Sequence, residues 1–283
     1  MSHAIFRFPE RVLTDFEGLQ VLCDFYDKAS RYRNCTFVLD WETLQYLEAN
    51  LSSLILAMVH KLRTENNINF FLDYSYLKGP MNVFWRNGLA HYIYKKPDKP
   101  NDYQQSTIPV KAFRISDVDS FVGYIEKDLL QHRGVESLQF QDMQRVKDSY
   151  LEIFCNVDLH AKTTYPVLAC GQFFPKQGEL KFTLVDLGVG FLHNIKSFTH
   201  TSAKPITKSE DAIKWAIAGN STKVGAAGGT GLNRIWSYCR KNNGGLHICT
   251  DGCYWAFDQG KITNWTLKNY FVGTTISLIF RFS

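Results

Sequence analysis

Residues 151–161 have the sequence LEIFCNVDLHA, and this stretch carries the first indication of the fold. Read as a helix, it places Glu152, Asn156 and His160 on one face, because they recur every four residues. Apolar residues beside them supply a surface for packing. A carboxylate, an amide and an imidazole form an unusual solvated face, where Lys–Glu pairs are typical. The stripe alone does not exclude an ordinary, partly exposed helix face, so its interpretation depends on the sequence that follows.

An apolar run that ends in acid and glycine follows at residues 182–190, FTLVDLGVG. This pattern predicts a strand that delivers Asp186 at its end. A carboxylate in that position can accept a hydrogen bond from the amino group of adenine, which distinguishes adenine from guanine. Gly188 and Gly190 allow the backbone to approach a flat base closely. Glycine turns after strands are common, so as an isolated string this motif also fits an ordinary turn.

A glycine cluster precedes a predicted helix at residues 233–240. The cluster consists of Gly228, Gly229, Thr230, Gly231 and Leu232. Free backbone N–H groups and the positive end of a helix form an anion site suited to phosphates. No Gly-Lys-Ser/Thr sequence follows, so the cluster is not a Walker A loop. Lys223, in a polar stretch just before the cluster, is a further candidate phosphate contact.

In this order, and with a terminal strand entered through Gly273-Thr274, these elements resemble the GHKL ATP-binding fold of gyrase, Hsp-type chaperones, histidine kinases and MutL. The resemblance implies a two-layer α/β sandwich over residues 106–283. It implies that Asn156 binds the Mg²⁺ of Mg-ATP and that Glu152 activates the attacking water. Thr274 would support Asp186 through a water molecule. His160 would be a polar residue that supports the residues in contact with the ligand. The alternative is that it is an ordinary surface residue.

The segment between Gly190 and Gly228 should contain the ATP lid of such a fold. It includes a predicted helix at residues 210–218, with Ser209 as its cap and Gly219 as its stop.

The N-terminal part alternates strand, helix, strand and helix at residues 35–39, 51–62, 68–72 and 81–92, which predicts a parallel sheet covered by helices. It resembles a STAS domain, the fold of anti-sigma-factor antagonists, with a generic βαβ module as the alternative. Regulatory STAS domains carry a phosphorylatable hydroxyl in the turn where Ala49 and Asn50 stand here. Ser52 and Ser53 come one turn later. A polar, proline-punctuated stretch at 95–102 places the boundary between residues 1–105 and 106–283.

The composition constrains the remaining possibilities. The net charge of +5 is spread along 283 residues, so it predicts no nucleic-acid partner. No apolar run reaches the ~20 residues of a membrane span, and the N-terminus has no leader pattern. Seven cysteines without close pairing are typical of reduced thiols in the cytoplasm.

These observations predict a cytoplasmic protein that binds ATP with Mg²⁺ and acts as a nucleotide-dependent signalling switch with slow ATP hydrolysis. The alternatives are a serine/threonine protein kinase that resembles anti-sigma factors, and a non-catalytic ATP-sensing module. An unidentified protein partner is expected in each case, and a homodimer remains open.

Overall fold

The computed structural model describes residues 4–96, 101–136, 138–157, 162–222 and 230–282. These residues form a mixed α/β protein with one large and one small sheet, which confirms the predicted fold class at that level. None of the helices within these ranges combines the length and the apolar character needed to cross a membrane.

The small sheet is parallel, with the strand order β1-β3-β5. Its strands are β1 (Ala4–Arg7), β3 (Thr36–Asp40) and β5 (Asn69–Leu72). Two helices, α1 (Phe16–Ser30) and α2 (Ser52–Asn66), pack against it, and a short ladder joins β2 (Arg11–Val12) to β4 (Tyr46–Leu47). The parallel pairing agrees with the prediction, whereas β1 and α1 were not predicted. We call residues 4–94 the N-terminal module.

The single helix predicted at 81–92 is wrong. A 3₁₀ turn (Gly79–Asn82) leads into two short helices, α3 (Val83–Arg86) and α4 (Leu89–Tyr94). The break falls at Asn87-Gly88, because Gly88 has a φ of 94°, which lies outside the helical region. The buried Asn87 side chain holds the break: it accepts from the Leu89 N–H at 3.0 Å and donates to Ser52 Oγ at 2.8 Å.

The large sheet has seven strands in the order β11-β10-β9-β12-β8-β7-β6, and neighbouring strands are antiparallel. The strands are β6 (Thr107–Phe113), β7 (Val167–Phe174), β8 (Glu179–Asp186), β9 (Gly245–Thr250), β10 (Cys253–Asp258), β11 (Lys261–Thr266) and β12 (Thr274–Arg281). Side chains alternate between the two faces, so Ile276, Leu278 and Phe280 share one apolar cluster.

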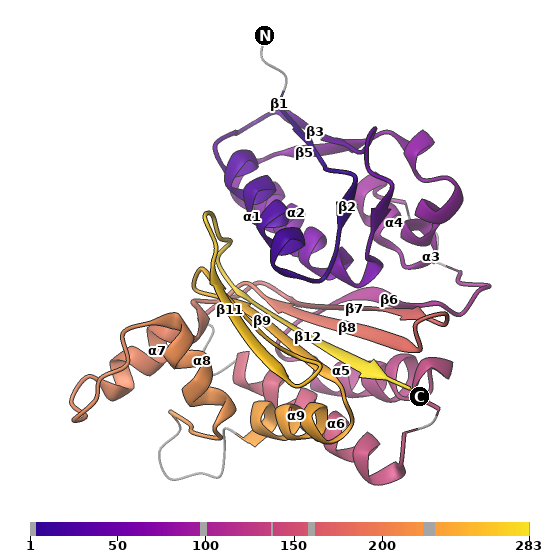
Figure 1. Ribbon diagram of the computed structural model, residues 1–283. Coiled ribbons are helices and arrows are strands. Elements are labelled where there is room, and N and C mark those ends of the chain that lie inside the picture. The colour runs from indigo at the N-terminus through magenta and orange to yellow at the C-terminus, as the bar shows by residue number, and fades with distance from the viewer. Residues whose placement is uncertain (1–3, 97–100, 137, 158–161, 223–229, 283) are drawn as a thin grey trace.

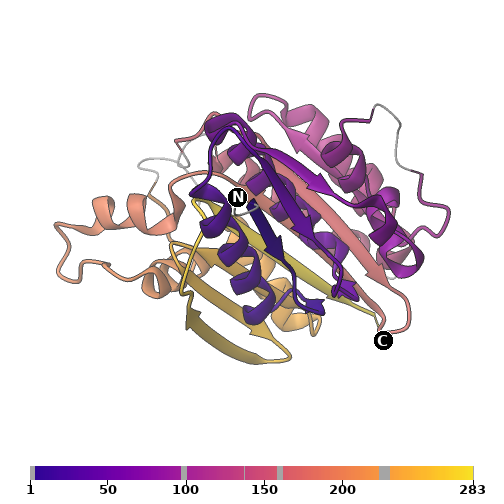
Figure 2. The ribbon, with the colours of Figure 1, turned by 90° about the horizontal axis from the view of Figure 1, so that it is seen from above.

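That face of the large sheet is covered by α5 (Val118–Tyr124) with a π-helical extension (Ile125–Leu129), by α6 (Phe140–Asn156) and by α9 (Thr230–Lys241) (Figure 1). Two further helices, α7 (Gly190–Thr199) and α8 (Ser209–Ile217), lie beyond one end of the sheet, and Figure 2 shows them projecting from the body of the molecule. Three more 3₁₀ turns lie at Ala49–Leu51, Tyr74–Tyr76 and Arg133–Val135.

The N-terminal module covers the opposite face of the large sheet (Figure 1). Leu168, Cys170 and Val185 point from β7 and β8 into the same apolar cluster as Leu54 and Met58 of α2. The molecule therefore has an additional layer above the two that were predicted for residues 106–283. Side chains alternate between the two faces of β7 and β8, and those on both faces are buried. Both faces of these strands are therefore covered by another layer.

The turn at Ala49-Asn50 lies in this junction. The Asn50 amide donates to Thr14 Oγ1 at 2.9 Å and to Thr183 Oγ1 on β8 at 2.8 Å. Lys181 of β8 forms an ion pair with Glu48 at 2.7 Å. Ser52 and Ser53 are fully buried. The Ala49-Asn50 turn is thus part of an internal interface.

We predict that Asn50→Ala lowers the free energy of unfolding by ~1–3 kcal/mol, because it removes two buried hydrogen bonds and leaves their hydroxyl partners buried. Urea denaturation measures the change. Asn264→Ala, on the exposed edge strand β11, is the matched control and should have little effect. Equal stability of Asn50→Ala and the wild type would contradict this role of the junction.

Candidate functional site

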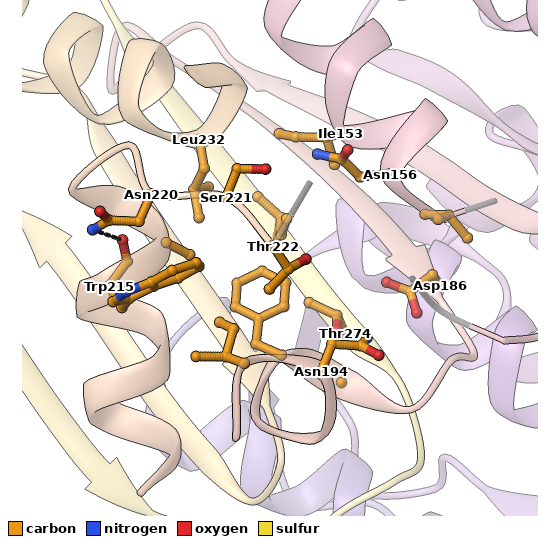
Figure 3. A pocket seen from close by; sticks show the side chains of 16 residues that line it. Ile153, Asn156, Asp186, Asn194, Trp215, Asn220, Ser221, Thr222, Leu232 and Thr274 are labelled. Carbon is orange, nitrogen blue, oxygen red and sulfur yellow. Dashed lines mark hydrogen bonds between the residues drawn. The ribbon is translucent and has the colours of Figure 1, made fainter. Parts of the chain in front are cut away.

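A cavity of ≈ 140 Å³ lies at the end of β8, on the face of the large sheet that carries α6 and α9 (Figure 3). Five residues from the predicted site line it, namely Asn156, Asp186, Gly190, Leu232 and Thr274. They come from α6, β8, α7, α9 and β12. The fold thus brings these distant parts of the sequence together. The cavity is smaller than the ~300–1,000 Å³ typical of small-molecule sites, so it suits the flat part of a ligand better than an entire nucleotide.

Asp186 is held at the sheet edge of this cavity by strand pairing. The antiparallel register of β8 and β12 places Thr274 directly opposite it. The Gly188 N–H donates to Asp186 Oδ1 at 2.8 Å. Thr274 Oγ1 also lies 3.1 Å from Thr250 Oγ1 of β9. The pairing of β8 with β12 thus places Thr274 beside the acid.

Burial raises the pKa of Asp186 from its ordinary value of 3.8 to about 6. Loss of hydration is the main cause, because it disfavours the charged form. The charge of nearby Asp251 raises the pKa further, while the hydrogen bonds from Gly188 and Thr274 oppose the shift. A carboxylate that is only 8% exposed, and that lines a cavity with a perturbed pKa, is a typical functional-site group.

The structure explains why residue 190 is a glycine, which the sequence alone did not. It adopts a φ of 79°, and a Cβ there would lie 2.2 Å from Asp251 Oδ1. The Asp251 carboxylate needs this space because its Oδ2 accepts from the Leu192 N–H in the first turn of α7, at 2.9 Å. Asp251 is thus a site residue that sequence reasoning missed. The turn Thr250-Asp251-Gly252 between two strands was its available signal.

Glu152 and the first turn of α9 form a second polar contact beside the cavity. Glu152 Oε1 accepts from the Thr230 N–H at 2.8 Å, and Oε2 accepts from Thr230 Oγ1 at 2.9 Å. Helix α9 begins at Thr230, three residues before the predicted start at 233. A Cβ on Gly231 would lie 3.0 Å from the Ser149 carbonyl oxygen, so the absent side chain permits close packing of α9 on α6.

Asn156 lies one turn after Glu152, at the C-terminal end of α6. Its Oδ1 is buried and has no hydrogen-bond partner among the described residues. An amide oxygen is a suitable ligand for Mg²⁺, which usually takes few protein ligands and keeps phosphate oxygens and waters. Within the described ranges no group of three or more His, Cys, Asp or Glu side chains could hold a metal ion. A Mg²⁺ ion at Asn156 would accordingly depend on a ligand's phosphates.

Four other predicted residues, His160, Lys223, Gly228 and Gly229, lie outside the described residues. The predicted cap of α8 is wrong: Lys208 occupies the N-cap position and Ser209 is the first helical residue. The Ser209 hydroxyl instead donates to the Asp251 carbonyl oxygen at 3.0 Å, which joins α8 to the β9–β10 turn. Gly219, with a φ of 88°, follows the end of α8 as expected.

Sequence reasoning also missed one wall of the cavity. Phe191, Asn194 and Ile195 of α7 and Trp215 and Ala216 of α8 line it, together with residues 220–222 (Figure 3). Helix α7 was not predicted at all. Its apolar residues were a usable signal, since Phe191 and Ile195 are four residues apart and both face the cavity.

No protein-family model matches this sequence, and a search of curated proteins found no significant match. The site is therefore defined by its own geometry: a buried acid at a strand end, an amide oxygen on a helix that has no partner in the described part of the chain, and the first turn of another helix beside a small cavity.

We predict that Asp186→Asn raises the free energy of unfolding at pH 7.5, by ~1–3 kcal/mol. A carboxyl whose folded-state pKa is raised to about 6 binds its proton more tightly when folded. Its contribution to stability is thus lost as the pH rises from about 4 to 6, and a neutral amide avoids this loss.

Denaturant titrations at pH 7.5 and pH 4.5 measure the effect, and the advantage of the variant should shrink at the lower pH. Asp148→Asn, which removes an exposed acid on α6, is the control. The same destabilisation of Asp186→Asn at both pH values would contradict the assignment.

Proposed function

We propose that this protein binds ATP with Mg²⁺ in the described cavity and hydrolyses it slowly. The observation that carries the proposal is the buried Asp186 carboxylate, which accepts from the Gly188 N–H and lines one cavity with Asn156, whose Oδ1 has no hydrogen-bond partner among the described residues. An ionised carboxylate in this place accepts a hydrogen bond from the adenine amino group and would be left unpaired by guanine's carbonyl oxygen. The apolar side chains around it suit a purine ring.

In this proposal the phosphates extend from the cavity towards the N-terminus of α9. Asn156 would hold the Mg²⁺, which would supply positive charge to neutralise the phosphate oxygens. Glu152, one turn away on the same helix, takes a proton from the attacking water, and ADP leaves as the γ-phosphate is transferred to the water oxygen. The close approach of α6 to α9 supports this arrangement, since Glu152 contacts Thr230 in the first turn of α9.

The biological role that we propose is a cytoplasmic switch whose nucleotide state is recognised by another protein. The N-terminal module then acts as a fixed scaffold, because its Ala49-Asn50 turn, Ser52 and Ser53 are buried against the large sheet. This burial also bears on the kinase alternative. A kinase would need a hydroxyl from a separate protein, since these two serines are not accessible in the folded chain.

The first test of this proposal concerns the base. We predict that Mg-ATP and Mg-ADP raise the melting temperature and that Mg-GTP does not, because a ligand that binds only the folded state stabilises it. Asp186→Asn should abolish the shift, since its amide can direct a donor at the adenine amino group. Asp148→Asn should retain it. Equal stabilisation by GTP would contradict the assignment of adenine.

The second test concerns the reaction. We predict that Glu152→Gln lowers ATP turnover by roughly two orders of magnitude while ATP still binds, because the variant loses the proton acceptor and keeps Asn156. Asn156→Ala should weaken Mg-dependent binding itself. Phosphate release and calorimetry measure the two effects. Turnover that is unaffected by Glu152→Gln would make ATP a bound effector, and turnover seen only with an added protein would favour the kinase.

A further inference from the structure

We propose that two copies of this chain pair through their β11 strands, so that the two large sheets join into one and Lys261 of each copy enters an acidic and aromatic groove of the other. This inference goes beyond the proposed function, because none of the described residues that line the cavity belongs to β11.

Strand β11 is the free edge of the large sheet. It is the last strand in the sheet order and pairs with β10 alone. All six of its residues are exposed, and the hairpin of β10 and β11 lies at a border of the molecule in Figure 2. In an antiparallel strand every second residue directs its N–H and C=O away from a given neighbour, so these groups are open to a further strand. The strand has neither a proline nor a bulge that would block such pairing.

A two-fold axis restricts how β11 can pair with its own copy. Two antiparallel strands that lie side by side are related by an axis perpendicular to the sheet, which keeps each side chain on its own face. Opposite residues share a face and faces alternate along a strand, so opposite positions must differ by an even number. An axis at Thr263 meets this condition. It pairs Thr263 with its own copy, a favourable cross-strand pair, and Lys261 with the second copy's Trp265.

These three side chains point to the face of the sheet that carries the N-terminal module. The register with β10 places Trp265 opposite Tyr254 and Thr263 opposite Ala256. Both Tyr254 and Ala256 belong to the apolar cluster of that module. Lys261 shares this face because it precedes Thr263 by two residues. The lysine of the second copy would therefore arrive on the side of β11 where the module lies.

A groove of ≈ 290 Å³ opens on this side, between the start of α1 and the edge of the sheet. Acidic and aromatic residues dominate its walls, which are formed by Asp15, Phe16, Glu17, Tyr254, Thr263 and Trp265. The ring of Phe16 lies 5.7 Å from that of Trp265, which is still 56% exposed. Burial raises the pKa of Asp15, and the neighbouring Glu17 carboxylate raises it further. An ammonium group opposite Trp265 would have an aromatic face and these two carboxylates within reach.

Lys261 supplies the charge that suits this groove. It is exposed, and it forms no ion pair within the described part of the chain. Asp258, which lies opposite it on β10, is instead paired with Arg281 at 2.7 Å. Glu17 is likewise exposed and without an ion pair among the described residues. The same axis that joins the two backbones brings these charges together twice, and this complementarity favours a second copy as the occupant.

A charge exchange tests the contact in the full-length protein. We expect the wild type to form a dimer with a Kd of ~1–100 μM, because a ladder this short buries little area. Lys261→Glu and Glu17→Lys should each raise the Kd at least about tenfold, since each places like charges together at both contacts. The double variant should recover most of the affinity. Asp15 is left unchanged because its side chain caps α1. Lys176→Glu, in the exposed β7–β8 turn, is the matched control.

A cross-link tests the register. Thr263→Cys places two thiols at the axis, where the Cα atoms of opposite residues are ~4.5–5.5 Å apart and within the range of a disulfide. We expect a disulfide-linked dimer after mild oxidation. Asn264→Cys is the matched control, because its two copies would be ~7–8 Å apart, too far for a disulfide. The wild type gives the background from the native cysteines.

Sedimentation velocity and non-reducing electrophoresis separate the outcomes. Recovery of the dimer in the double variant, with cross-linking through Thr263→Cys, supports the proposal. A wild type that stays monomeric up to ~100 μM overturns it and would leave the edge to an extended segment of another protein. A dimer that Lys261→Glu does not weaken overturns it as well, because another surface would hold the copies together. Loss of the dimer without recovery in the double variant overturns the charge contact, and cross-linking through Asn264→Cys instead overturns the register.

Discussion

The alternation of side chains along β8 is the constraint on which both halves of the molecule depend. Leu180, Phe182 and Leu184 point towards the helices α6 and α9, and Asp186 continues this row into the cavity. Thr183 and Val185 point to the other side, where they meet the N-terminal module. A shift of one residue in the register with β12 would exchange the two rows. It would bury the acid under the N-terminal module and turn the polar junction towards the helices.

The polar groups at the cavity are arranged at a cost to stability. Asp186 is buried with a raised pKa, and Asn156 Oδ1 is buried without a partner among the described residues. Neither arrangement is what packing alone would select, since an apolar side chain in either place would avoid the desolvation. The junction has such an atom too: the Asn50 amide N–H groups donate to Thr14 and Thr183, but Asn50 Oδ1 is buried without a partner among the described residues. The buried acid with a raised pKa at a cavity, and not the unpartnered oxygen alone, therefore distinguishes the candidate site from the structural interface.

Sequence reasoning succeeded where a signal was local. The strands and the Asp186–Gly190 motif followed from apolar runs and glycines, whereas Thr274, which lies opposite Asp186 on β12, was singled out only by the family resemblance. It failed where distant residues decided the outcome. A side chain at position 190 would clash with Asp251, which is far away in the sequence. The helical pattern breaks at Gly88, where the preceding Asn87 donates a hydrogen bond to the distant Ser52. Local patterns also could not predict that the N-terminal module packs on the large sheet. The Ala49-Asn50 turn is buried only by β8, which is distant in the sequence.

The same two strands connect the junction to the cavity. Thr183 on β8 hydrogen-bonds Ser277 on β12 at 2.8 Å, and each lies three residues from a site residue on its own strand, Asp186 and Thr274. At about 3.4 Å per residue the two polar sites are about 10 Å apart along the strands, on opposite faces. A paired strand moves as a unit, so a displacement of the N-terminal module at Asn50 would act on the position of the buried acid. Among the described residues, those of the N-terminal module do not line the cavity, so any influence of this module on the acid would act through the shared strands β8 and β12.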